Sequence, residues 1–104
     1  MPSTVKRTAR TKTTRYDVAD HLRTPEEMAA YLDAWLAEAS EDAAGIAKAL
    51  GDIARAKGMS QVARDSGLSR ESLYRALSAE GNPSLATVLK VARALGVRLH
   101  AQAV

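Results

Sequence analysis

Hydrophobic residues recur at spacings of three and four along most of this 104-residue chain, and they fall into five groups. Such spacing puts the apolar side chains on one face of a helix, where they can pack against a core. The first group includes Trp35, the only tryptophan, which we expect in the core. The pattern predicts an all-α domain with five helices, at about 25–39, 41–57, 61–66, 70–78 and 85–95.

The expected helix ends carry residues suited to capping. Thr24, Pro25 and Glu27 have the pattern of a capping box, in which the threonine hydroxyl and the glutamate carboxylate each accept a backbone N–H. Serine hydroxyls can accept the first N–H groups of the later helices, and glycines can adopt the positive φ at which helices end. We expect serine caps at Ser40, Ser60, Ser69 and Ser84, and terminating glycines at Gly58, Gly67 and Gly96.

The hydrophobic pattern changes from a helical to an alternating spacing after Gly96. Val97, Leu99 and Ala101 alternate with polar residues, which predicts a short β-strand over 97–102. A lone strand needs a partner, and no other segment has this pattern. We therefore expect the same strand of a second copy to pair with it, with Val97, Leu99 and Ala101 at a dimer interface. The alternative is an extended tail.

Residues 60–78 have the pattern of a helix-turn-helix, in which the second helix enters the DNA major groove. Ala63 is small enough for another helix to cross closely above it, and Gly67 stands where the first helix must end. Leu73 and Leu77 give the second helix a buried face. The alternative is an ordinary hairpin of two helices, since short motifs also match by chance.

The outward face of the expected second helix carries groups that suit nucleic acid. Arg70 can make a bidentate contact with guanine, while Glu71 and Tyr74 can touch neighbouring bases. Arg75 and the polar side chains at the two helix starts can hold phosphates. The candidate DNA-binding residues are Ser60, Gln61, Ser69, Arg70, Glu71, Tyr74 and Arg75.

Charge divides the chain into three parts. Residues 1–16 carry five bases and no acid, and we expect a flexible basic arm over 1–15 that tracks phosphates or serves only solubility. Residues 17–42 carry eight acids and one base, whereas residues 43–104 carry nine bases and four acids. The two main parts can therefore attract partners of opposite charge, although charges that only solvate helix faces are common.

Several kinds of site have no counterpart in the sequence. There is no cysteine for a disulfide framework, and no apolar run near the roughly 18 residues that span a membrane. His21 and His100 stand apart, without further metal ligands or a nucleophile in a recognisable pattern. We expect no enzyme activity, no catalytic or metal site, no cofactor and no membrane partner, in a cytoplasmic, nucleoid-associated protein.

A family resemblance covers residues 16–104, which we take as one DNA-binding domain. It is carried by residues 51–61 (GDIARAKGMSQ), 67–78 (GLSRESLYRALS), 81–83 (GNP) and 95–97 (LGV). In these stretches the chain resembles the antidote-type antitoxins of bacterial addiction modules, which are related to prophage DNA-binding proteins. The DNA-binding part looks like the Cro/repressor (XRE-like) type of helix-turn-helix.

The resemblance implies an antitoxin that neutralises a small toxin of the RelE/ParE type. It also implies that the protein represses its own operon by binding double-stranded operator DNA as a homodimer. The acidic segment 17–42 would then face a basic toxin. The candidate toxin contacts are Tyr16, Val18 and Leu22, since the buried stripe of the first helix does not need them.

Two other functions stay open on the sequence. The first is a stand-alone transcriptional regulator of prophage type, without a toxin partner. A small basic protein encoded beside the gene would favour the antitoxin over this regulator. The second is a helical adaptor whose hairpin binds protein, and it would show no salt-dependent affinity for DNA.

Overall fold

The computed structural model describes residues 21–78 and 80–104. In this part of the chain the predicted all-α class is confirmed, with five helices and no strand. None of these helices is long and apolar enough to cross a membrane. The basic arm 1–15 and two candidate toxin contacts, Tyr16 and Val18, lie outside the described residues. The helices are α2 (Pro25–Glu38), α3 (Ala43–Lys57), α4 (Met59–Ser66), α5 (Arg70–Ala76) and α6 (Leu85–Leu95).

Side-chain caps define where several helices begin. Thr24 Oγ1 accepts the Glu27 N–H at 3.1 Å, and the Glu27 carboxylate accepts the N–H groups of Arg23 and Thr24, so the predicted capping box is confirmed. The hydrogen bond from the Arg23 N–H, with a smaller contribution from the Thr24 N–H, stabilises the carboxylate and holds the pKa of Glu27 below its usual value. The predicted caps Ser69 and Ser84 are also confirmed, and each hydroxyl accepts an N–H three residues later.

Two predicted serine caps are wrong. The Asp42 carboxylate accepts the Gly45 N–H at 2.9 Å and caps α3, so Ser40 does not. A charged acceptor at this position also interacts favourably with the helix dipole, which a serine hydroxyl cannot match. Gly58, at φ +116°, ends α3 and directly precedes α4. Ser60 therefore lies inside the first turn of α4, which has no side-chain cap.

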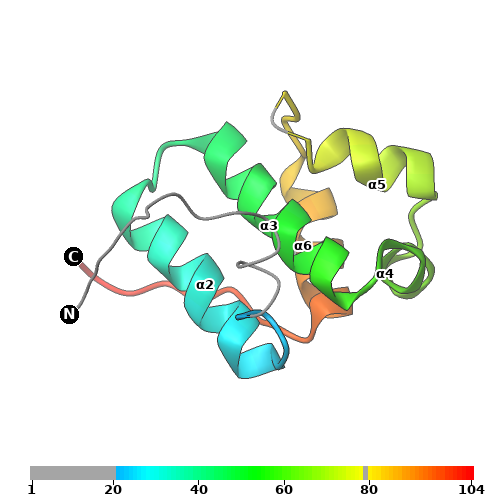
Figure 1. The fold of residues 1–104 in the computed structure, drawn as a ribbon. Coiled ribbons are helices and arrows are strands. Elements are labelled where there is room, and N and C mark those ends of the chain that lie inside the picture. Colours follow the sequence, from blue (N-terminus) through cyan, green and yellow to red (C-terminus); the bar gives the residue numbers. More distant parts are fainter. Residues whose placement is uncertain (1–20, 79) are drawn as a thin grey trace, which may run out of the picture.

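The core forms where α3 and α6 meet the other helices. α3 contacts α2, α4 and α6, and α4 also contacts α5 and α6. Figure 1 shows α2 and α5 on opposite sides of the molecule, with α3 and α6 between them. Acidic α2 and the α5 helix of the expected DNA-binding motif are thus far apart. The largest fully buried side chains are Leu22, Leu50, Ile53, Val62, Leu73, Leu77, Val91 and Leu95.

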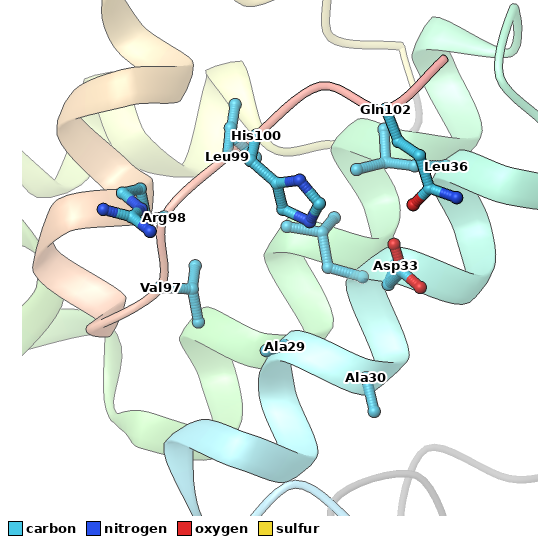
Figure 2. Close-up of a pocket in the computed structure, with 10 residues that line it drawn as sticks. Ala29, Ala30, Asp33, Leu36, Val97, Arg98, Leu99, His100 and Gln102 are labelled. Carbon is cyan, nitrogen blue, oxygen red and sulfur yellow. The ribbon is translucent and has the colours of Figure 1, made fainter. Parts of the chain in front are cut away.

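The C-terminal segment is not the predicted strand, since residues 97–102 have no strand conformation. A strand needs a neighbour that shares backbone hydrogen bonds, whereas this segment runs beside α2, whose backbone groups are bonded within the helix (Figure 2). Val97 and Leu99 pack against the core, and Ala101 is exposed. Much of the apolar face assigned to a dimer is therefore covered within one chain.

Five apolar residues are not where the pattern placed them, and one of them is Leu36 of α2, which is 37% exposed. Leu22, expected to be free for a toxin, is 2% exposed in the core, whereas Trp35 is only half-buried and lies outside the core cluster. Leu85 and Leu89, expected on the buried stripe of α6, are 69% and 50% exposed. Leu85 lies two turns before the buried Ala92 on the same face of α6. Its exposure therefore means that no described residue covers this face of α6 at Leu85 and Leu89, whereas Val88 packs against the core.

Candidate nucleic-acid interface

The turn between α4 and α5 is held by local hydrogen bonds. Gly67 has φ +80° and donates its N–H to the Ala63 carbonyl at 3.0 Å, which confirms the predicted helix end. The N–H of Leu68 donates to the same carbonyl at 3.2 Å, and its side chain packs against the core. The buried Ser66 hydroxyl also donates to this carbonyl, at 3.2 Å. Together with the Ser69 cap, these bonds define the direction in which α5 leaves the turn.

α5 has one buried face and one free face. Leu73 and Leu77 are fully buried, as predicted, and they attach the helix and its C-cap to the core. The side chains at the other positions of α5 include two bases, an acid and a phenol. The exposed residues on α5 are Arg70, Glu71, Tyr74 and Arg75, so every one of its predicted DNA contacts faces solvent.

Arg70 and Tyr74 form a pair on this free face. The Arg70 guanidinium carbon lies 5.7 Å from the centroid of the Tyr74 ring, and its Nη2 lies 3.5 Å from the Tyr74 hydroxyl. These residues are one turn apart, which is the spacing at which side chains on a helix meet. The cation–π contact orients the guanidinium and leaves its other N–H donors free.

Arg75 and Glu71 are also one turn apart, with Arg75 Nη2 at 4.0 Å from Glu71 Oε2. Both side chains are largely exposed, at 74% and 88%. Solvent screens a pair of this kind, so the contact is weak. An approaching phosphate or base edge can therefore separate the two groups at little cost.

α4 contributes a second set of polar groups. Ser60, Gln61 and Arg64 are exposed and lie three or four residues apart, hence on one face of α4. Arg64 was not predicted as a contact, although its spacing from Gln61 in the sequence could have indicated it. α4 packs against α5, and the two helices lie at the same end of the molecule (Figure 1). The predicted DNA-binding residues are thus exposed on two neighbouring helices.

The described residues contain no group of three His, Asp or Glu side chains placed to hold a metal ion. His100 lines a groove of about 340 Å³ between α2 and the C-terminal segment, with Asp33 and Arg98 among its neighbours (Figure 2). This groove lies beside α2, away from α5. The exposed polar groups on α4 and α5 remain the candidate contacts for nucleic acid.

Comparison with known proteins gives the family. The model of a family described as "probable addiction module antidote protein" matches residues 12–103. A protein of Haemophilus influenzae (strain KW20 / Rd), described as uncharacterized, is 53% identical over 87 residues, which are 84% of this chain and 88% of that protein. No solved structure matches the chain. The expected resemblance to antidote-type antitoxins is confirmed, and an antidote implies a toxin as partner. The chain belongs to the family of probable addiction module antidote proteins.

Proposed function

We propose that this chain is the antitoxin of a toxin–antitoxin pair, that it neutralises a toxin of the RelE/ParE type, and that it represses the shared operon. Membership of the antidote family supports the first part. The observation that carries the DNA-binding part is the free face of α5, which follows a tightly bonded turn from α4 and presents Arg70, Tyr74 and Arg75 to solvent. We assign α4 and α5 to a Cro/repressor-like helix-turn-helix, with α5 as the recognition helix.

In this proposal α5 determines the base sequence that is bound. Arg70 donates two hydrogen bonds to O6 and N7 of a guanine, a geometry that a planar guanidinium suits and a lysine does not. The Tyr74 ring packs against this guanidinium at the observed 5.7 Å. The Tyr74 hydroxyl contacts a neighbouring base. Glu71 accepts a hydrogen bond from a cytosine amino group once its weak pair with Arg75 has opened.

The remaining polar groups set the position of the domain on the phosphate backbone. Arg75, Ser60, Gln61 and Ser69 are the proposed phosphate contacts from the sequence, and the exposed Arg64 on α4 joins them. Phosphate contacts carry no direct sequence information, so they contribute affinity and orientation. We assign the same role to the basic arm 1–15, whose five positive charges suit a polyanion. Operator binding would place the protein on the bacterial nucleoid.

Operator binding as a homodimer is part of the proposal. Leu85 and Leu89 are exposed one turn apart on α6, the helix that follows the proposed recognition helix. A two-fold axis between two such helices would bring Leu85 of one copy against Leu89 of the other, and the reverse. Two copies of α5 could then contact half-sites one DNA turn apart, which is the usual arrangement of dimeric helix-turn-helix proteins.

The test combines growth and DNA binding. The protein encoded beside this gene is expressed with and without the chain, and the chain is assayed by gel shift on the promoter of the same operon. We expect growth arrest by the neighbour, rescue by the chain, and a shift that weakens as salt rises. Rescue without any shift would contradict the repressor part, whereas a shift without a toxic neighbour would favour a stand-alone regulator.

A further inference from the structure

Trp35 has an unusual position for the only tryptophan of a small domain. It is half-buried and lies outside the hydrophobic core cluster, although it is the largest apolar side chain present. It belongs to α2, on the side of the molecule away from α5 (Figure 1). Tryptophan is enriched among the residues that contribute most to protein–protein binding. Its place on this surface therefore suggests contact with another protein.

A shallow depression of about 300 Å³ lies beside Trp35. Tyr31, Ala34, Glu38 and Ala39 line the rest of it, and their spacing of three and four residues places it along one face of α2. The two alanines leave room beside the aromatic rings, while Glu38 brings a carboxylate to the rim. The depression is thus apolar on its aromatic side and anionic at one end.

Gly45 allows the indole ring to lie against the first turn of α3. A Cβ atom at this position would lie 2.6 Å from Cζ3 of Trp35 and would also overlap the Asp42 carboxylate. The indole ring and this carboxylate therefore both lie beside Gly45. The Asp42 side chain is held in this position because its Oδ1 accepts the Gly45 N–H at 2.9 Å. A second carboxylate is thereby held near the edge of the indole ring.

Most charges near the depression are negative, since the neighbouring bases Lys48 and Arg55 of α3 are paired with the buried Asp52. Between residues 24 and 47 the sequence has six acids and no lysine, arginine or histidine. A surface of this kind repels nucleic acid and attracts a basic protein. The groove in Figure 2 differs in this respect, since Arg98 and His100 line it together with Asp33. The six acids are Glu26, Glu27, Asp33, Glu38, Glu41 and Asp42, and all of them are exposed.

We propose that the depression beside Trp35 receives an arginine or lysine side chain of the toxin. The aliphatic stem of that side chain would cover the indole ring, and its charge would lie near Glu38 and Asp42. This inference rests on the proposed antitoxin function and names the surface through which it acts. The occupant is basic because the surface along α2 carries exposed carboxylates, which attract a positively charged side chain. Because α2 and α5 lie on opposite sides, toxin and operator can bind at the same time (Figure 1).

One experiment observes the depression directly. The full chain is labelled with 5-fluorotryptophan, which gives a single fluorine resonance because Trp35 is the only tryptophan. The protein encoded beside the gene is then added, and in a separate sample promoter DNA is added. We expect the toxin to shift or broaden the resonance and the DNA to leave it unchanged. A bound toxin that leaves the resonance unchanged would overturn the proposed surface.

A second experiment measures the affinity of toxin for charge-reversed chains by calorimetry. Glu38→Lys should weaken toxin binding about tenfold or more, since it places a like charge beside the incoming cation. Ala34→Arg should act in the same direction by filling the depression with a charge of the chain itself. Glu80→Lys is the matched control, because Glu80 is also an exposed acid and stands in the turn before α6, far along the chain from α2. Thermal unfolding checks that each variant is folded.

The outcomes separate the two proposals. Equal affinities of the Glu38→Lys and Glu80→Lys chains for the toxin would overturn the surface and leave the antitoxin function standing. A wild-type chain that neither binds nor neutralises the neighbouring protein would overturn the antitoxin function, and the surface with it. Operator binding should be the same in the Glu38→Lys, Ala34→Arg and wild-type chains, since both changes lie on α2.

Discussion

The Tyr31 hydroxyl donates a hydrogen bond of 2.9 Å to Asp52 Oδ2 and thereby joins α2 to α3. The Asp52 side chain is only 4% exposed, and it also has Arg55 Nη2 at 3.2 Å and Lys48 Nζ at 3.5 Å. Arg55 and Lys48 belong to α3 itself, whereas Tyr31 comes from α2. A buried carboxylate needs such partners, because its desolvation is otherwise strongly unfavourable. The tyrosine therefore helps to hold the acidic helix against the rest of the domain.

Tyr31→Phe should lower the free energy of unfolding by about 1–3 kcal/mol, because it removes one hydrogen bond from a buried charged acceptor while keeping the ring. Urea denaturation followed by circular dichroism measures this difference. Tyr74→Phe is the control, since Tyr74 is 44% exposed and its hydroxyl, among the described residues, meets only Arg70 at 3.5 Å. Equal losses in the two variants would show that the Tyr31–Asp52 bond does not stabilise the fold.

The same contact predicts a dependence on alkaline pH. Burial raises the pKa of Tyr31 above its usual 10.0, and the hydrogen bond and negative charge of Asp52 add to this, while the hydrogen bond from Trp35 opposes it. The folded state thus holds the phenolic proton more tightly than the unfolded state. Its contribution is complete below the unfolded pKa and is lost as pH rises through the folded pKa. The stability difference between wild type and Tyr31→Phe should therefore shrink as pH rises above about 10 in urea titrations, and a constant difference would contradict the raised pKa.

Arg70→Ala should reduce discrimination between the operator and a site with one altered guanine by about 1–3 kcal/mol, because the bidentate contact is lost. The fold should survive, since Arg70 is exposed. Fluorescence anisotropy with the two DNA duplexes measures the effect, and Arg70→Lys should restore charge but little discrimination. If footprints on the promoter are the same for wild type and the alanine variant, Arg70 does not contact a base.

Replacement of Leu85 and Leu89 by serine should convert a dimer into a folded monomer. Both side chains are at least half exposed in the single chain, so the change removes little from its core. Sedimentation equilibrium gives the oligomeric state, and a gel shift should show weaker operator binding because two half-sites are no longer linked. A variant that still sediments as a dimer would place the contact on another surface.

Deletion of residues 1–15 should weaken binding to every DNA sequence by a similar factor. The arm carries five positive charges, so the slope of log affinity against log salt should fall by up to about 4. Changing the five bases to glutamine in the full-length chain separates charge from length. An unchanged slope in both chains would mean that the arm only serves solubility.

Local interactions made much of the fold predictable from the sequence. The capping box at Thr24 and Glu27, the caps Ser69 and Ser84, and the positive φ of Gly67 and Gly96 all depend on groups within a few residues of each other. Such contacts form wherever the residues occur in this order. The five helices and the exposed face of α5 follow from the same short-range periodicity. The prediction that Ser40 caps α3 was wrong although it concerns local contacts. Both serine and aspartate can cap a helix, but only Asp42 stands directly before the first residue of α3.

The tertiary structure decided which apolar residues are covered. Periodicity placed Trp35, Leu85 and Leu89 on apolar stripes, but a stripe is buried only where another element lies over it, and that element comes from elsewhere in the chain. The same reason makes Leu22 a core residue. It also explains why residues 97–102 form no strand, because the backbone partner that a strand needs is non-local and the chain places them beside a helix instead. The sequence thus determined the helices and the polar face of α5, and three-dimensional packing determined the surfaces left free for partners.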